Sequence, residues 1–250
     1  MRSQILNQSR WLVMAGAVGL AASVASGADT ALSIAANSSL GSGLFEVTME
    51  DGTTLPDGTF IWSLDSPMDI VDSGSGETIA RLLFGSIMMS TAGTVSHSFV
   101  VQSAGVDTNF SLGSALVNTG LIQNPEGRTS AGITLTDNDG DGAMLTGNMN
   151  GGNMFEAFYD NGAVFANLLG GPFGFGTAFD SRAMDDEYPG GDGNFAAFAG
   201  PLNEIGIAWD FTLSANDSAG GTSVFAVIPA PATGLGFLVG AGLFSGRRRR

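Results

Sequence analysis

The most regular feature of the chain is an alternation of apolar and polar residues with a period of two. It is clearest over residues 205–213, where two isoleucines, a tryptophan, a phenylalanine and a leucine alternate with small or polar residues. In an extended strand this spacing puts all the bulky side chains on one face. Residues 45–49 and 60–64 show the same pattern. We therefore predict strands with one buried face, with Trp62 and Trp209 in the core.

Several further segments have the length and composition of strands and are bounded by glycine, asparagine or aspartate. They are residues 95–102, 132–136, 143–147, 154–159, 163–168 and 222–228. Residues 79–89 are the one stretch where a helix competes with a strand, and Gly85 interrupts it. Many short strands joined by polar turns predict one all-β domain over residues 29–228. We expect an antiparallel β-sandwich of the jelly-roll-like or Ig-like kind.

Glycine is concentrated in residues 140–193, which hold 13 glycines in 54 positions. Glycine weakens strands and widens the unfolded ensemble, so we expect long irregular loops, above all over residues 170–176 and 188–193. Loops on a rigid scaffold often carry binding residues. Four phenylalanines in this region are predicted to be exposed and to be the aromatic residues that would stack on a sugar: Phe173, Phe175, Phe195 and Phe198.

The composition excludes several kinds of chemistry. The chain has no cysteine and one histidine, His97, which excludes disulfides, thiolate metal sites, cysteine nucleophiles and sites with two imidazoles. No Gly-x-Ser-x-Gly elbow and no phosphate-binding glycine motif occurs. His97 alternates with apolar residues, which indicates a hydrogen-bonded residue of the core rather than a general base. We predict that the protein is not an enzyme.

The charge is distributed unevenly along the chain. All 24 acidic residues lie between Asp29 and Asp217, and only three arginines lie among them, so this region carries a formal charge of −21. Six further arginines lie near the two ends. A body this acidic is repelled by the phosphates of nucleic acids, and we exclude nucleic acid as a partner.

Residues 1–28 have the three parts of a secretory signal peptide. Arg2 and Arg10 supply the positive charge, the apolar run of residues 11–24 follows, and small residues at 25–28 fit a cleavage site. The apolar run is shorter than a typical membrane span, although a retained anchor is the alternative. The prediction is export through a secretion translocase with cleavage by signal peptidase.

Residues 229–250 form a second segment of unusual composition, which we call the sorting tail. It begins with the short motif Pro229, Ala230, Pro231, Ala232, Thr233. A glycine-rich apolar run over residues 234–246 follows, too short for a comfortable permanent span. The chain closes with a basic cluster that would stay cytoplasmic under the positive-inside rule: Arg247, Arg248, Arg249 and Arg250.

This arrangement resembles the PEP-CTERM sorting signal of exported bacterial proteins, which has a short proline motif, a hydrophobic helix and a terminal arginine cluster. The resemblance is limited to the sorting tail and departs from the family in one place, because alanine stands at Ala230 where the family has glutamate. It implies transient anchoring in the inner membrane through a short hydrophobic helix, followed by cleavage near the proline motif by an exosortase-type transpeptidase. An ordinary C-terminal anchor with a basic stop is the alternative.

The sharpest local motif of the body is acidic. Asp137, Asp139 and Asp141 stand at alternate positions before a glycine, as in the first half of a calcium-binding loop. The twelfth position is Asn148, so the bidentate glutamate that closes such a loop is missing. We predict either a weak calcium site or an acidic turn that joins the strands on either side as a hairpin.

A second acidic cluster, at residues 185–187 beside Arg182, is expected to be a solvated loop. The resemblance of the sorting tail, together with the missing catalytic motifs, implies a non-catalytic exported protein of the cell surface, outer envelope or extracellular matrix that associates with exopolysaccharide. Two alternatives stay open at this point. One is a lectin-like carbohydrate-binding module, with or without calcium, and the other is a secreted hydrolase that uses paired carboxylates.

Overall fold

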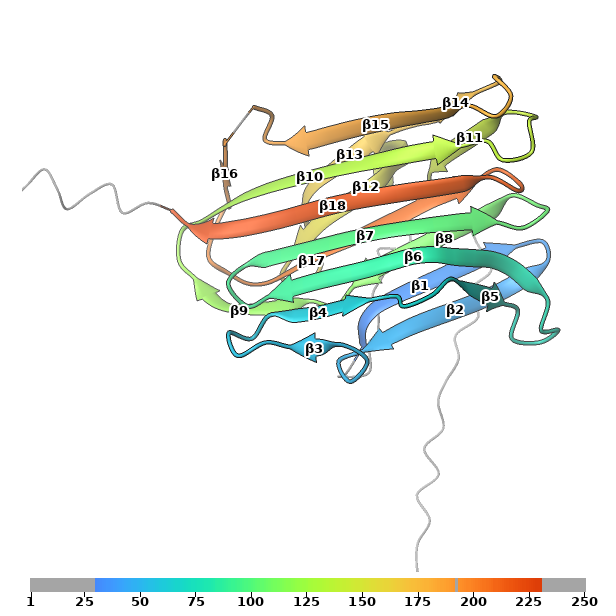
Figure 1. The fold of residues 1–250 in the computed structure, drawn as a ribbon. Coiled ribbons are helices and arrows are strands. Elements are labelled where there is room, and N and C mark those ends of the chain that lie inside the picture. Colours follow the sequence, from blue (N-terminus) through green and yellow to red (C-terminus); the bar gives the residue numbers. More distant parts are fainter. Residues whose placement is uncertain (1–29, 192, 231–250) are drawn as a thin grey trace, which may run out of the picture.

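The computed structural model describes residues 30–191 and 193–230, and this part of the chain is all-β (Figure 1). Two antiparallel sheets pack face to face, with a single short 3-10 turn at Asn150–Gly152, which is consistent with the predicted β-sandwich. Within the described residues, no helix is both long and apolar enough to cross a membrane. The predicted signal peptide and the sorting tail after Ala230 lie outside the described residues.

The first sheet has nine strands. In spatial order its main path is β13 (Ala163–Gly170), β12 (Asn153–Tyr159), β17 (Leu202–Leu213), β8 (Thr108–Ser114), β1 (Thr30–Ser38) and β2 (Gly41–Thr48). Three strands pair beside this path: β11 (Ala143–Gly147), β14 (Phe173–Phe175) and β9 (Val117–Ile122). β2 and β13 are the two ends of the path.

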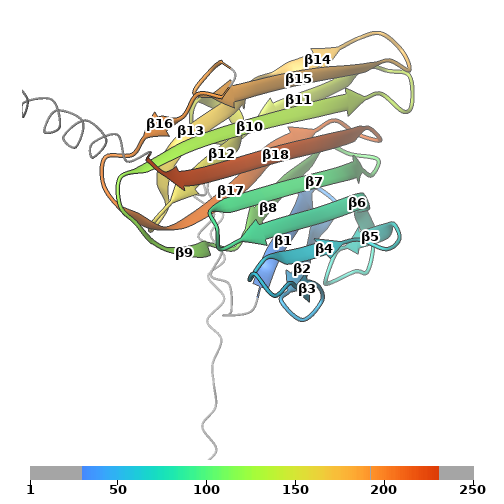
Figure 2. The same ribbon diagram turned by 60° about the vertical axis from the view of Figure 1, so that its left-hand side comes forward.

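The second sheet also has nine strands. Its main path is β15 (Ser181–Tyr188), β10 (Pro125–Thr136), β18 (Ser218–Pro229), β7 (Thr94–Ser103), β6 (Thr78–Ser90), β4 (Phe60–Ser63) and β3 (Thr53–Thr54). Beside it, β16 (Ala196–Ala197) pairs with β10 and β5 (Met68–Val71) pairs with β6. Both views show β15 at one side of this sheet and β3 at the other (Figures 1 and 2).

Residues 79–89, where a helix competed with a strand, lie within β6. This strand pairs with β7 from Ala80 opposite Ser103 to Ser90 opposite Thr94, and a bulge interrupts the register between Leu82 and Phe84. Its apolar run contributes Ile79, Leu82, Ile87 and Met89 to the core. This segment forms a strand because the long partner strand β7 hydrogen-bonds to its backbone N–H and C=O groups and the core covers one of its faces.

In the glycine-rich region the predicted strands over residues 154–159 and 163–168 are present as β12 and β13. The region is more regular than predicted because β14 and β15 lie in it as well. Residues 185–187 are not a loop but belong to β15, where Asp185 pairs with Gly132 and Asp186 with Ala131 of β10. β15 is an outer strand of its sheet, and charged side chains on such a strand discourage pairing with another chain. The acidic residues of β15 do not alternate with apolar ones, so the period-two pattern did not predict this strand.

Aromatic side chains from both sheets meet in the centre of the core. The Trp209 ring on β17 is 1% exposed and packs edge-on against Phe99 of β7, at 5.2 Å between centroids, and against Phe155 of β12, at 5.1 Å. Phe211 stacks on Phe99 at 5.9 Å. Trp209 Nε1 donates a hydrogen bond of 3.2 Å to Ser223 Oγ on the opposite sheet. The predicted core position of Trp209 is confirmed.

Replacing Trp209 by alanine is expected to lower the free energy of unfolding by about 3–5 kcal/mol, because the change leaves a cavity between the sheets. It also removes the hydrogen bond to Ser223. Urea denaturation followed by circular dichroism measures the effect. Val224→Thr, on the exposed face of β18, is the control and should change stability by less than about 0.5 kcal/mol. Equal losses in both variants would contradict this account of the core.

Candidate functional site

Two connections that cross between the sheets meet at one end of the molecule. Residues 137–142, which we call the acidic crossover loop, lead from β10 to β11, and residues 214–217 lead from β17 to β18. The Asn138 side chain donates to the Asn216 carbonyl (3.1 Å), and the Asn216 side chain donates to Asp139 Oδ2 (2.9 Å). The predicted hairpin is therefore wrong, because the strands on either side of the loop belong to different sheets.

Asp137 is the hub of the acidic crossover loop. Its Oδ1 accepts hydrogen bonds from the backbone N–H groups of Asp139 (3.2 Å) and Gly140 (2.7 Å). Its Oδ2 accepts from Gly142 (3.1 Å) and Phe179 (2.9 Å). Burial, the largest single influence, raises the pKa of this carboxyl, but the four donors together hold the pKa below its usual value. The protein's own N–H groups therefore hold this loop in shape.

A third carboxylate comes from the neighbouring connection. Oxygen atoms of Asp137, Asp139 and Asp217 all lie within 4.8 Å of one another. Asp217 is buried, and it accepts hydrogen bonds from the Asn138 backbone N–H (3.2 Å) and the Ser214 hydroxyl. Burial raises the pKa of the Asp217 carboxyl, and the charges of Asp137 and Asp139 raise it further against these two hydrogen bonds.

The predicted metal set of Asp137, Asp139 and Asp141 is thus brought together only in part, because Asp217 takes the place of Asp141. A side-chain hydrogen bond with Asp139, and then the charge of Asp139, raise the pKa of Asp141. Carboxylate oxygens are the ligands that calcium prefers. Each carboxylate of the group also accepts hydrogen bonds from the protein, so calcium binding stays a prediction.

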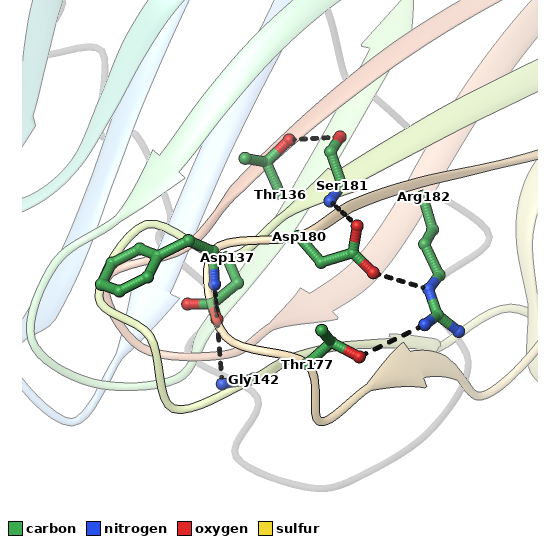
Figure 3. A network of polar contacts seen from close by, with 8 residues as sticks. Thr136, Asp137, Gly142, Thr177, Asp180, Ser181 and Arg182 are labelled. Atoms are coloured by element: carbon green, nitrogen blue, oxygen red, sulfur yellow. Dashed lines mark hydrogen bonds and ion pairs between the residues drawn. The ribbon is translucent and has the colours of Figure 1, made fainter.

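The segment between β14 and β15 covers the other side of the loop. Asp137 N–H donates to the Asp180 carbonyl (3.1 Å), and Asp180 forms an ion pair of 3.1 Å with Arg182 (Figure 3). The Arg182 guanidinium also lies 5.0 Å from the ring centre of Phe175. Phe179, which the sequence analysis missed, is 72% exposed, and its ring lies where a Cβ on Gly140 would stand.

The four phenylalanines predicted as exposed sugar contacts, Phe173, Phe175, Phe195 and Phe198, are half-buried. Three of them, Phe173, Phe175 and Phe198, pack against the core. The Phe198 ring stacks on Phe165 at 4.7 Å and meets Tyr159 edge-on at 4.9 Å. The expected exposure of these rings is wrong, and for Phe198 the reason is that these two aromatic neighbours cover the ring. The role of the four rings in sugar binding stays a prediction.

His97 lies between the sheets. It is 2% exposed, its ring centre lies 5.3 Å from that of Phe99, and its Nε2 has no hydrogen-bond partner in the described part of the chain. The predicted core position is confirmed, and the predicted hydrogen bonding is wrong for Nε2. Burial lowers the pKa of the imidazole to about 3. His97 is therefore neutral at pH 7 and shielded from solvent.

No protein-family model matches the chain, and no curated protein matches it. Among solved structures, the enzymatically active domain of tailspike protein 4 of bacteriophage CBA120 is 13% identical, with 73% of this chain and 22% of that chain covered and a TM-score of 0.26. This chain thus spans about a fifth of the tailspike chain.

Two other solved structures are similarly distant. TmCBM61 in complex with β-1,4-galactotriose is 10% identical, with a TM-score of 0.20. The match covers 72% of this chain and 93% of the TmCBM61 chain. A chain in the structure of the infectious bursal disease virus Gx strain is 10% identical, with a TM-score of 0.24. The match covers 81% of this chain and 61% of the viral chain. Likenesses this weak assign neither a family nor a function.

His97→Leu is expected to reduce the loss of stability on acidification. The pKa of the His97 imidazole is about 3 in the folded protein and 6.5 when the group is free in solution. At any pH between these two values, the imidazole therefore takes up a proton only when the chain unfolds. The wild-type protein therefore loses stability as the pH falls below 6.5, by up to about 1.4 kcal/mol per pH unit. Urea denaturation at pH 7 and pH 4.5 measures the slope. Ser98→Ala, on the outer face of the same strand, should keep the wild-type slope, and equal slopes in all three proteins would refute the assignment.

Asp139→Asn is expected to raise the melting temperature at pH 7, because it removes one of the charges that oppose ionisation of Asp217. The folded pKa of Asp217 is raised, so the folded state binds the proton more tightly than the unfolded state does. Stability therefore falls as the pH rises above the ordinary value of 3.8. The advantage of the variant should disappear below that pH. Glu77→Gln, an exposed carboxylate elsewhere, is the control.

The same melting experiment tests the calcium prediction. A rise in melting temperature with millimolar calcium that is seen in the wild type and lost in Asp139→Asn would support a site at the acidic crossover loop. Identical melting of the wild type in calcium and in EDTA would contradict it.

Proposed function

We propose that the protein is a non-catalytic component of the bacterial cell surface or extracellular matrix. In this proposal it is exported by its signal peptide, held briefly in the inner membrane by the sorting tail, and released or attached by an exosortase-type transpeptidase. Outside the cell it associates with exopolysaccharide. The observation that carries the proposal is the way in which the folded body holds the start of the tail.

β18 leads directly into the tail and lies inside its sheet. It pairs with β10 over its whole length, from Ser218 opposite Thr136 to Pro229 opposite Pro125, and with β7 over nine residues on its other side. Its apolar face is buried in the core, with Phe225 and Val227 at 0% and 1% exposure. A strand that is paired on both sides gives a tethered domain a firm attachment, since its hydrogen bonds share a pull along the strand.

The first two residues of the proline motif are part of the body. Pro229 is the last residue of β18, and the Ala230 N–H donates a hydrogen bond of 2.9 Å to the Asn124 carbonyl. A transpeptidase must hold an extended, accessible segment of its substrate. Because the N–H of Ala230 is bonded to the body, we place the processed bond after this residue.

Two properties of the body support a non-catalytic role outside the cell. The three arginines within the acidic region are each paired with a carboxylate, Arg81 with Asp69, Arg128 with Glu187 and Arg182 with Asp180. The surface is thus dominated by negative charge, which favours solubility and contact with anionic polymers through bridging cations. The one imidazole of the chain, His97, is enclosed in the core and cannot reach a substrate.

Intact-mass spectrometry of the exported protein tests the proposal. The mature chain is expected to lack all four terminal arginines and to end at Ala230 or a few residues later. Replacing these arginines by glutamine should leave the tail uncut and the protein in the membrane fraction. Exported protein that still carries Arg250 would overturn the sorting mechanism, and a C-terminus before Pro229 would overturn the placement of the processed bond.

A further inference from the structure

The described part of the molecule has a cleft at one edge of the sandwich, where outer strands of the two sheets lie next to each other. It lies between β2, the last strand of the first sheet, and β3, β4 and the β4–β5 connection of the second sheet, and it has a volume of about 670 Å³. We call it the edge cleft. Clefts that bind small molecules have volumes of about 300–1,000 Å³. Both views place these strands on the side of the molecule opposite to β14 and β15 (Figures 1 and 2).

One part of the lining is aromatic and held firmly in place. Trp62 of β4, a predicted core residue that is 8% exposed, and Phe45 of β2 both contribute to the edge cleft, with ring centres 5.9 Å apart and planes at 43°. The Trp62 ring lies over Gly85 of β6, where an added Cβ would stand 3.2 Å from ring atom Cζ3. The absence of a side chain at Gly85 lets the indole lie close to the strand. The ring pair is therefore set before any ligand arrives.

The other part of the lining is rich in oxygen. The acidic residues Glu46, Asp51 and Asp65 line the edge cleft, as do the hydroxyl residues Thr53 and Ser63. Asp51 accepts hydrogen bonds from the Thr48 backbone N–H (2.7 Å) and hydroxyl (2.8 Å). The backbone donor and then the hydroxyl lower the pKa of the Asp51 carboxyl. This carboxylate is ionised and fixed in place at neutral pH.

Glu46 and Asp65 are in a different situation. Both side chains are exposed, and in the described part of the chain neither carboxylate accepts a hydrogen bond or forms an ion pair. No arginine is among the residues that line the edge cleft. These two carboxylates therefore offer acceptor oxygens to a ligand without first breaking contacts inside the protein.

The cleft carboxylates do not converge on a point. The one group of three carboxylates in the described residues whose oxygens lie within 4.8 Å of one another is Asp137, Asp139 and Asp217, far from this cleft in the fold. Acceptors that do not converge match a ligand with several separate donors. They match a single metal ion or a compact ammonium group poorly, because such a cation needs several oxygens around one centre.

We propose that the edge cleft binds a neutral oligosaccharide chain. A sugar ring has an apolar C–H face, which packs on an aromatic ring, and hydroxyl groups around its rim, which donate to carboxylates. The half-buried Phe45 supplies the first kind of contact, with Trp62 packed beside it, and Glu46 and Asp65 supply the second. Uronic acids and sulfated sugars are excluded, because their charges would meet the cleft carboxylates with no cation to compensate them.

The test is isothermal titration of the full chain with three neutral linear hexasaccharides, of glucose, mannose and galactose units, and with hexagalacturonate and spermine as charged probes. Saturable binding of at least one neutral hexasaccharide is expected, with little dependence on sodium chloride. Glu46→Gln and Asp65→Asn should each weaken it about tenfold, the loss expected for one hydrogen bond to a charged acceptor. Trp62→Phe should weaken it and remove the ligand-induced change in tryptophan fluorescence.

Matched controls locate the effect. Glu77→Gln and Asp185→Asn remove exposed carboxylates outside the cleft and should keep the wild-type affinity. Glu46→Gln and Asp65→Asn alter exposed side chains without described partners, so unchanged melting temperatures will show that these two proteins are folded. The proposal is overturned if no neutral hexasaccharide binds. It is also overturned if binding survives both substitutions, or if spermine binds in a salt-sensitive way while the neutral probes do not.

Sugar binding in the edge cleft rests on the proposed association with exopolysaccharide and gives it a site. The experiments can refute the sorting proposal and the sugar-binding proposal independently of each other. Retention of Arg250 on the exported protein would refute sorting and leave sugar binding untouched. Hexasaccharides recovered intact after the titration agree with a non-catalytic role. Cleaved products that disappear in Glu46→Gln would refute that role while keeping the edge cleft as the sugar site.

Discussion

The packing of Phe99 against Trp209 and Phe211 fixes how the two sheets face each other. Phe99 belongs to β7 in one sheet, and the other two belong to β17 in the other. The hydrogen bond from Trp209 to Ser223 adds a direction to this contact, because the indole N–H must point at β18. Aromatic rings pack in a few preferred geometries, so a slip of either sheet would cost both ring contacts and the hydrogen bond.

The acidic crossover loop is positioned by strand pairing within one sheet. Asp137 follows β10 and Asp217 precedes β18, and these two strands are paired along their full length in the same sheet. Their register places Thr136 opposite Ser218, and this brings the two carboxylates together across the adjacent connections. The buried Asp217 is the cost of this register, since its raised pKa records a charge that is poorly solvated and close to two others. The four N–H donors to Asp137 offset part of the same repulsion on the loop side.

Alternation along the chain predicted the strands whose inner residues are large and apolar, such as β7, β17 and β18. It missed β1 and β8, where alanine, serine and glycine dilute the pattern, and β15, where the residues are acidic. The sequence pattern also failed to predict Asp217 as a member of the carboxylate group. Asp217 is hydrogen-bonded to Asn138, but the two residues are 79 positions apart in sequence. The edge cleft was hidden for the same reason, since alternation fixes the face of a strand but not its neighbours. Trp62 was correctly placed in the core, yet nothing in its own segment revealed that Phe45 of the other sheet lies beside it.

β18 has a consequence for the orientation of the whole molecule. Its first residue follows the buried Asp217, and its last begins the proline motif, so the acidic group and the point of attachment lie at opposite ends of one strand. Twelve extended residues measure about 40 Å. In the anchored state that we propose, the strand would therefore separate the acidic group from the point of attachment by several Debye lengths, each about 8 Å at physiological salt. The sandwich would then work as a spacer that holds the three converging carboxylates out in the surrounding solution, where the ions and polymers of the medium, rather than the membrane, set their ionisation.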